Sequence, residues 1–258
     1  MNRLYAGLFF LLSINGFCQP NSDSAISKAR VDKYYMKSYL KDYRDILTSP
    51  FKPSVKKIVG AGVYAGTMYM LISQYDEKIQ LFSQKQRTPF ANNVSKYVFE
   101  PMGGGIYPLI VIASFYTQGV LWNNQKSKKV AMNCVKSFII AGSFTQVGKF
   151  AFSRQGPLVD TPDANKWFKG NPNRSFFSGH TTTAFSIATV IAEEYKETIW
   201  VPVVSYSLAT CAGLSRIHDN AHWASDVLTG ALVGYLTGKL IVCKNNWGIN
   251  IIPGIIIP

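Results

Sequence analysis

Six apolar segments recur along this chain and constrain its fold more than any other feature. Polar or charged connections separate them. Apolar runs of about 16 to 18 residues between polar connections are typical of packed helices, since strands are shorter. The sequence therefore predicts an all-α fold, a bundle of about six core helices over residues 58–74, 106–122, 130–148, 181–192, 198–214 and 227–242.

The lengths of these segments leave two organisations open. A bilayer-spanning helix needs about 20 apolar residues, and the fourth segment meets Glu193 and Glu194 after only about a dozen. Lys126, Lys128 and Lys129 favour a cytoplasmic loop after the second segment, which would place the polar motifs described below on the outer side of a membrane. A membrane-embedded bundle is the preferred prediction, and a soluble helical domain is the alternative.

The first 19 residues have the pattern of a secretory signal peptide. Arg3 precedes an apolar centre of about ten residues, and small residues lie near the end of the segment. A short membrane anchor is the alternative, because a cleaved signal followed by six spanning segments would turn the motifs inward. Aromatic and aliphatic residues at helical spacing then predict an amphipathic helix on the core or the bilayer surface. The predicted divisions are 1–19 (signal peptide), 20–56 (amphipathic segment), 57–243 (helical domain) and 244–258 (C-terminal tail).

The charge of the chain favours anionic partners. It carries 27 Lys and Arg against 14 Asp and Glu, a formal net charge of +13. No nucleic-acid-binding motif or long basic run accompanies this excess, so we expect a membrane surface or a phosphate group and no nucleic acid. Cys134, Cys211 and Cys243 lie in or at the end of apolar segments, which predicts buried thiols rather than disulfides or a metal site.

The most informative polar stretch covers residues 215–226. His222 and Asp226 are four residues apart where the last apolar segment begins, so on a helix they share a face. A carboxylate in that position can hold the imidazole of a nucleophile or base, and Arg216 adds a permanent cation suited to phosphate or carboxylate oxygens. The alternative is a loop histidine whose neighbouring Asp226 only caps a helix.

Two other segment ends carry groups that bind anions. Ser178, Gly179 and His180 open the fourth segment, where the first turn of a helix offers free N–H groups. Lys149 and Arg154 lie where the third segment ends. Since three segment ends carry phosphate-type ligands, we expect one phosphate site at one end of the bundle.

At these residues the sequence resembles the type 2 phosphatidic acid phosphatase and vanadium haloperoxidase superfamily (PAP2). The third motif of that family is Ser-Arg, five residues, His, three residues and Asp, and residues 215–226 match it in full. The second is Pro-Ser-Gly-His, which residues 178–180 match, with Phe177 in place of Pro. Both matches imply a PAP2-like helical bundle.

The first motif of the family is met only in part. It is a Lys, six residues and Arg-Pro; Lys149 and Pro157 match, but Gly156 stands where Arg is expected. Arg154 lies two residues earlier, and we expect it to take the place of the missing cation. The resemblance covers about residues 57–243.

The resemblance also implies the roles of the site residues. His222 would attack phosphorus, Asp226 would orient it, and His180 would protonate the leaving oxygen and later activate water. The remaining position in the third motif, His218, is expected to be a solvated loop residue. No metal or other cofactor is implied. The phosphate would be held by Lys149, Arg154, Ser178, Gly179 and Arg216.

The expected function is metal-independent hydrolysis of phosphate monoesters or pyrophosphates, of a lipid or a small soluble ester, through a phosphohistidine. Two alternatives remain. Vanadate bound at His222 would give a haloperoxidase, and Gly156 in place of Arg would suit an envelope protein whose site is weakened or inactive. We expect the protein in the cell envelope, in the membrane with its site facing the periplasm or outer side, or secreted to the periplasm.

Overall fold

The computed structural model describes residues 31, 33–48, 54–168 and 174–244. The predicted signal peptide and residues 245–258 of the predicted tail lie outside them. In the described part of the chain the regular elements are helices, apart from one isolated β-bridge between Gln155 and Arg174. The α-helices are α2 (Lys33–Thr48), α3 (Val55–Met70), α4 (Asp76–Lys85), α5 (Pro89–Val94), α6 (Ile106–Leu121), α7 (Gln125–Phe152), α8 (Gly179–Glu194), α9 (Trp200–His218) and α10 (Ala224–Lys244).

The six predicted core helices are confirmed as α3, α6, α7, α8, α9 and α10, and several are longer than predicted. α7 extends beyond 130–148 at both ends. α8 continues through Glu193 and Glu194 because both carboxylates are paired with lysines on neighbouring helices. Nζ of Lys239 lies 2.5 Å from Oε1 of Glu193, and Nζ of Lys129 lies 3.1 Å from Oε1 of Glu194.

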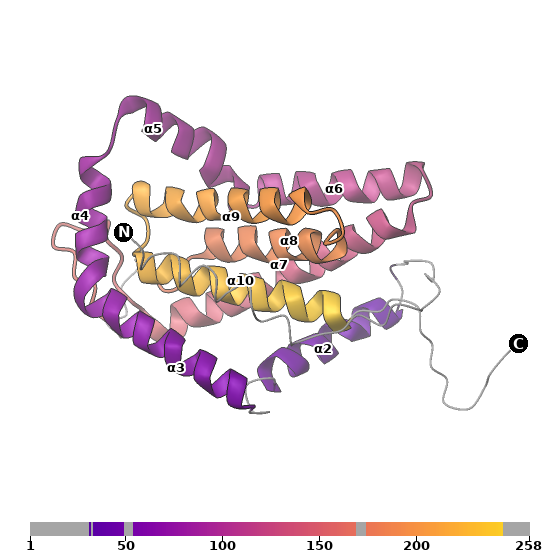
Figure 1. Cartoon of the computed structure of the whole chain (residues 1–258), viewed down its shortest axis with the longest axis horizontal. Helices are drawn as coiled ribbons and strands as arrows, with labels where there is room; N and C mark the ends of the chain where they lie inside the picture. Colours follow the sequence, from indigo (N-terminus) through magenta and orange to yellow (C-terminus); the bar gives the residue numbers. More distant parts are fainter. Residues whose placement is uncertain (1–30, 32, 49–53, 169–173, 245–258) are drawn as a thin grey trace, which may run out of the picture.

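α8 lies at the centre of the bundle, where it packs against α7, α9 and α10 (Figure 1). Three glycines of α10 face α8 and let the two backbones come close together. Buried threonines and serines of α8 fill the remaining space with small side chains. A Cβ atom at Gly230, Gly234 or Gly238 would lie 2.6, 2.4 or 2.7 Å from the backbone oxygen of Ser178, Thr182 or Ser186.

The connection between α3 and α6 is mostly helical. It contains α4, α5, a π-helical turn (Ser95–Phe99) and a 3-10 turn (Glu100–Met102). Gly103, just after the 3-10 turn, is packed against α8: a Cβ there would lie 2.4 Å from the backbone oxygen of His180. Only glycine permits this approach.

This connection also holds the loop between α9 and α10 through side-chain hydrogen bonds. One of them involves His218, which closes α9, so the prediction that His218 is a solvated loop residue is wrong. The segment before α6 therefore helps to position the third motif. The hydrogen bonds join Gln80 to Asn220 at 2.8 Å, Ser95 to Asp219 at 2.8 Å, and His218 to Asn92 at 3.0 Å.

α2, which forms part of the predicted amphipathic segment, lies against the core. The buried ammonium of Lys136 on α7 lies 2.8 Å from the carboxylate of Asp42. Tyr43 shares a 2.7 Å hydrogen bond with Ser143 on the same helix. These polar contacts attach α2 to the bundle, at the opposite end of α10 from its first turn (Figure 1).

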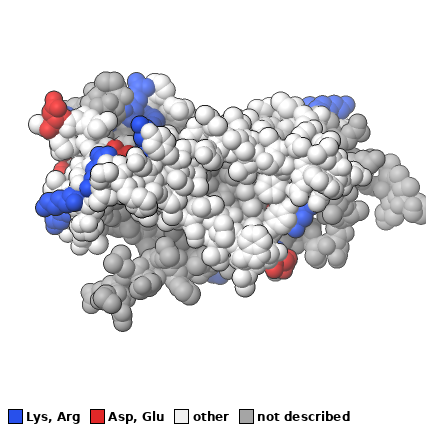
Figure 2. Space-filling model, turned by 90° about the horizontal axis from the view of Figure 1, so that it is seen from above, with Lys and Arg blue, Asp and Glu red and all other residues white. Residues whose placement is uncertain are grey.

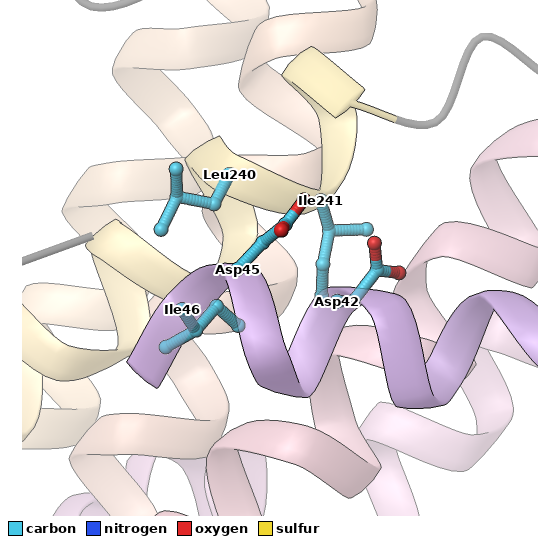
Figure 3. A pocket seen from close by; sticks show the side chains of 5 residues that line it. All are labelled: Asp42, Asp45, Ile46, Leu240 and Ile241. Atoms are coloured by element: carbon cyan, nitrogen blue, oxygen red, sulfur yellow. The ribbon is translucent and has the colours of Figure 1, made fainter. Parts of the chain in front are cut away.

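A shallow surface hollow lies where α2 crosses the last turns of α10 (Figure 3). Asp42, Asp45 and Ile46 line it from α2, and Leu240 and Ile241 line it from α10. At 1.5 Å per residue, this end of α10 lies about 20 Å from its first turn. The hollow is therefore separate from the motif residues.

The surface and the helix lengths are those of a membrane protein. Within the described residues, α7 and α10 are long and apolar enough to cross a membrane, and α5 to α6 would add a third span if the pair, bent by 55°, crosses as one. On the face in Figure 2, charged side chains gather mainly at the two ends, with a wide uncharged band between them. Exposed apolar side chains of α6 and α9 include Ile106, Leu109, Ile110, Trp200, Val203 and Val204.

Candidate active site

The ends of four helices meet at one end of the bundle, on the left in Figure 1. Because successive helices run in opposite directions, α7 and α9 end there and α8 and α10 begin there. Lys149 lies in the last turn of α7 and Arg216 in the last turn of α9. His180 lies in the first turn of α8, and His222 lies two residues before the start of α10. The three motifs thus lie together at one end, as predicted.

His222 is held through one ring nitrogen. Its Nδ1 lies 3.7 Å from Oδ2 of Asp226, which is too long for a hydrogen bond. The hydroxyl of Ser175 bridges them: it lies 3.2 Å from Nδ1 and donates a short hydrogen bond to the same Oδ2. The backbone N–H of Trp223 donates to that oxygen at 3.1 Å. Asp226 is thereby fixed beside an imidazole that is only 7% exposed.

The burial of His222 has an electrostatic consequence. Loss of water contact lowers the pKa of its ring, and the nearby charges of Lys149 and Arg216 lower it further, although Asp226 opposes both effects. A lowered pKa keeps the ring neutral near pH 7. A neutral imidazole with a free nitrogen is the form that can act as a nucleophile.

Arg154 does not bind at this cluster, and the prediction that it holds phosphate is contradicted by its contacts. α7 ends before Ser153, whose left-handed backbone (φ 40°) turns the chain, so Lys149 and Arg154 diverge. Its guanidinium is fully buried, and all five of its N–H groups donate to protein acceptors. They are Ala164 O from Nε and Nη2, Ser225 Oγ and Asp226 Oδ1 from Nη1, and Asp76 Oδ2 from Nη2.

Arg216 and Lys149 are the cations left at the cluster. Arg216 is only 8% exposed, and its buried Nε has no protein acceptor. A buried donor without a partner is costly, so an anion that accepts from it would be stabilised. Lys149 lies near enough to influence the pKa of both His180 and His222. The two side chains form one positive region beside the histidines.

The first turn of α8 faces the same region. Ser178 caps the helix, with its hydroxyl accepting from the N–H of Thr181 at 3.4 Å, and Gly179 is the first helical residue. The N–H groups of a first turn have no acceptor within their own helix and attract anions. Ser178 and Gly179 therefore lie at a helix N-terminus that attracts anions, and their binding of phosphate stays a prediction.

His180 projects from this turn into a positive field. Its pKa is lowered to about 4, first by burial and then by the charges of Arg216, His222 and Lys149. The ring is therefore neutral in the empty site at pH 7. A bound phosphate dianion would offset the positive charges and raise the pKa of His180, so the ring could then carry the proton that a leaving oxygen needs.

Glu100 is a site residue that sequence reasoning missed. Its Oε1 lies 3.2 Å from Nη1 of Arg216 and 3.9 Å from Nε2 of His180. The carboxylate thus lies between two groups to which a phosphate would bind. No sequence signal indicated it, because it is far along the chain from each motif and follows no motif spacing.

Ser175 and Asp76 were also missed. Ser175 lies three residues before Ser178, and its polarity beside two phenylalanines was an available signal. Asp76 lies in α4, outside any motif, and only the fold brings it to Ser225. Gly156 leaves the expected arginine position empty: a Cβ there would lie at ordinary contact distance, 3.4 Å from Cβ of Ser175.

The helical bundle thus gathers two cations, a helix N-terminus and a carboxylate-anchored histidine at one end, an arrangement that can hold an anion beside a histidine suited to nucleophilic attack. Residues 130–249 match the family model described as the PAP2 superfamily. This part of the chain, just under half of its length, belongs to the PAP2 superfamily. Helices α2 to α6 precede the matched residues.

Two relatives share part of their sequence with this chain. The Lipid A 1-phosphatase of Porphyromonas gingivalis is 35% identical over 136 residues, which are 52% of this chain and 28% of that protein. The Bacitracin transport permease protein BcrC of Bacillus licheniformis is 31% identical over 121 residues, which are 47% of this chain and 58% of that protein. The chain therefore spans about a quarter and just over half of these relatives.

A solved structure supports the fold assignment. The crystal structure of LpxE from Aquifex aeolicus superimposes with a TM-score of 0.50 and 22% identity, covering 65% of this chain and 94% of that one. At this identity the likeness concerns the fold alone. The predicted all-α, PAP2-like bundle is confirmed, and with its spanning helices the chain is a membrane protein.

Proposed function

We propose that this protein is a metal-independent phosphatase that hydrolyses a phosphate monoester or pyrophosphate of a lipid through a phosphohistidine on His222. One observation carries the proposal: Nδ1 of His222 contacts Ser175, which Asp226 anchors, beside a buried arginine whose Nε lacks a protein acceptor. The held nitrogen leaves Nε2 for the attack on phosphorus. A phosphoryl group would supply the missing acceptor for Arg216.

The first step forms a bond between Nε2 of His222 and phosphorus while the bond from phosphorus to the leaving oxygen breaks. Arg216, Lys149 and the N–H groups at the start of α8 would stabilise the charge on the nonbridging oxygens. Because these groups supply the positive charge, the step needs no metal. Protonated His180 gives its proton to the leaving oxygen.

The second step releases the phosphate. A water molecule attacks phosphorus, His180 takes its proton, and the bond between phosphorus and Nε2 breaks. His222 then returns to the neutral form with its proton on Nδ1, still facing Ser175 and Asp226. The two steps restore every group, so the cycle consumes only water and the ester.

A lipid substrate is favoured by the surroundings of the site. The bundle presents apolar side chains outward next to the end that carries the motifs, so a lipid in the bilayer could approach without leaving it. The named Lipid A 1-phosphatase relative makes lipid A phosphate the first substrate to test. We further propose that the site faces the periplasm or outer side, where such lipids are accessible.

Purified protein in detergent micelles tests the proposal through phosphate release. The substrates are lipid A phosphate, phosphatidate, phosphatidylglycerol phosphate, a polyprenyl pyrophosphate and a soluble aryl phosphate. We expect release from at least one lipid, undiminished by EDTA and inhibited by vanadate. Release that disappears with EDTA and returns with Mg²⁺ would contradict the metal-free mechanism, and halide oxidation with added vanadate would support a haloperoxidase instead.

Replacing Glu100 with glutamine should strengthen anion binding. Its carboxylate competes for Arg216 and His180, and glutamine keeps the shape without the charge. Because the group is partly exposed, we expect only an about 3- to 5-fold lower inhibition constant for vanadate. Exposed Glu197, three residues after the end of α8, provides the matched control as Glu197→Gln. Weaker vanadate inhibition in Glu100→Gln would mean that the carboxylate assists binding.

Replacing Gly156 with arginine should strengthen the site. The position has room for a Cβ beside Ser175, and the family pattern places a cation there. We expect kcat/KM to rise about 10-fold, in line with one added charge-assisted hydrogen bond. Gly156→Ala fills the same space without charge and should leave kcat/KM close to wild type. Equal values for the two variants would show that the missing cation does not limit this enzyme.

A further inference from the structure

We propose that Asp76 and Arg154 are positioning residues for the Asp226–His222 pair, so that α4, which precedes the residues matched by the family, belongs to the catalytic machinery. The proposal rests on the proposed function of His222 as the nucleophile. It assigns to Arg154 a task different from phosphate binding. It also gives a task to a buried carboxylate that lies outside every motif.

Arg154 fixes the side of Asp226 that faces away from His222. Its Nη1 donates to Oδ1 of Asp226 at 2.5 Å, while Oδ2 of the same carboxylate receives Ser175 and Trp223. Both oxygens are thereby engaged from different directions. The carboxylate cannot rotate without breaking charged hydrogen bonds in a fully buried space, where such bonds are strong.

Asp76 in turn fixes Arg154 and the start of α10. Its Oδ2 lies 2.7 Å from Nη2 of Arg154 and accepts from Ser225 Oγ at 2.5 Å. Its Oδ1 accepts the backbone N–H of Ser225 at 2.9 Å, one of the free N–H groups of the first turn of α10. Because Asp226 follows Ser225 directly, this contact with α4 also fixes the position of the Asp226 backbone.

The buried charges of this group do not balance. Asp76 and Asp226 carry two negative charges and Arg154 one positive charge, and all three side chains are at most 1% exposed. Unbalanced charge is unfavourable away from water. The balance is restored when the ring of His222 becomes positive, as it does when Nε2 bonds to phosphorus and Nδ1 keeps its proton. The surplus negative charge therefore favours the phosphohistidine step.

Other charged groups also face His222 and set the background for this effect. Lys149 of α7 and Arg216 of α9 oppose a positive ring, as does His180 of α8 if it is protonated. Asp226 of α10 favours it. Asp76 reaches the ring only through Arg154 and Asp226, so its removal should change the behaviour of His222 without changing the groups that hold phosphate.

The test compares Asp76→Asn with Glu77→Gln. Glu77 is the adjacent residue of α4 and accepts the N–H of Ala164 at 3.3 Å, a hydrogen bond that glutamine can keep. At metal sites, losing an outer hydrogen-bond partner of a ligand costs about 10- to 100-fold in activity, and we take the same scale for this pair. We expect that loss in kcat for Asp76→Asn with KM changed by less than about 2-fold, and wild-type kinetics for Glu77→Gln.

A double variant separates positioning from a general structural effect. If Asp76 acts through Asp226, then adding Asp76→Asn to Asp226→Asn should cause no further loss of kcat. An equal loss of kcat in both backgrounds would overturn the proposal. Thermal unfolding of each variant in the same detergent establishes whether it is folded.

The titration of His222 gives a readout that does not need turnover. Ring signals of the three histidines are assigned by NMR with the His→Gln variants. In the unliganded protein, the midpoint of His222 should move to lower pH by on the order of one unit in Asp76→Asn and stay in place in Glu77→Gln. An unmoved midpoint in Asp76→Asn would overturn the proposal even if wild type hydrolyses none of the lipids tested.

If the Asp76→Asn variant does not fold, the Asp76→Glu variant tests the same proposal. It keeps the charge, so His222 should titrate as in wild type. The longer side chain displaces Arg154, so kcat should fall. Wild-type kcat in this variant would show that the position of the carboxylate does not matter, and would overturn the positioning role.

Discussion

Replacing His222 with alanine is expected to remove turnover and the covalent intermediate together. The variant loses the Nε2 atom that attacks phosphorus, while the cations and N–H groups that bind phosphate remain. Loss of a nucleophile held by an oriented acid–base group typically costs about 10⁴- to 10⁶-fold in kcat. Phosphate release from the best lipid substrate measures the loss. Acid-quenched wild type should also carry ³²P on His222 after brief exposure to labelled substrate.

His218→Ala is the matched control for this variant. His218 is in the same stretch of sequence, but its ring contacts Asn92 rather than the cluster around Arg216. We expect turnover close to wild type and undiminished labelling. If the His222→Ala variant still became labelled with ³²P, the nucleophile would have to be another residue, which would contradict the mechanism.

Replacing Gly234 with alanine is expected to destabilise the bundle more than any other single methyl group in α10. The added Cβ would lie 2.4 Å from the backbone oxygen of Thr182 and 2.9 Å from the backbone nitrogen of Ser186, so whole helices must separate. Overpacking of this kind lowers the free energy of unfolding by about 1–3 kcal/mol. The higher helix propensity of alanine offsets up to about 1 kcal/mol of this loss. The midpoint of thermal unfolding in detergent should fall by several degrees, at roughly 2–4 °C per kcal/mol.

Gly142→Ala in α7 is the matched control. No atom lies within 4 Å of the Cβ that it would add, so only the helix preference changes and the midpoint should stay level or rise. A midpoint for Gly234→Ala equal to that of Gly142→Ala would mean that α8 and α10 are less tightly packed than the structure indicates. The comparison also bears on the site, because α8 and α10 each contribute their first turn to it.

The sequence by itself determined the helices and the residues that carry the chemistry. The apolar segments fixed the positions of the six core helices because a buried helix must be apolar over most of its length. The spacing of His222 and Asp226 and the groups at residues 178–180 were readable because the contacts they depend on are local, within one or two helical turns. The resemblance to PAP2 then followed from these short stretches.

The ends of the helices were less predictable. α8 looked interrupted at Glu193 and Glu194, because the sequence does not reveal that Lys239 and Lys129 pair with them from other helices. The connection between α3 and α6 has no apolar run from which its short helices could be predicted, because they owe their positions to side chains of the α9–α10 loop. In both places tertiary contacts outweighed the local pattern.

Only the tertiary structure decided what Arg154 does. From sequence spacing it could lie with Lys149 at the phosphate, but the left-handed turn at Ser153 directs it into a fully buried site behind Asp226. Asp76 meets it there from α4, 78 residues away along the chain. A buried charge must be paired wherever the fold can supply a partner, and no local pattern encodes a partner at that distance. Because α4 packs against α9 and α10, Arg154 binds Asp226 and lies away from the cluster around Arg216.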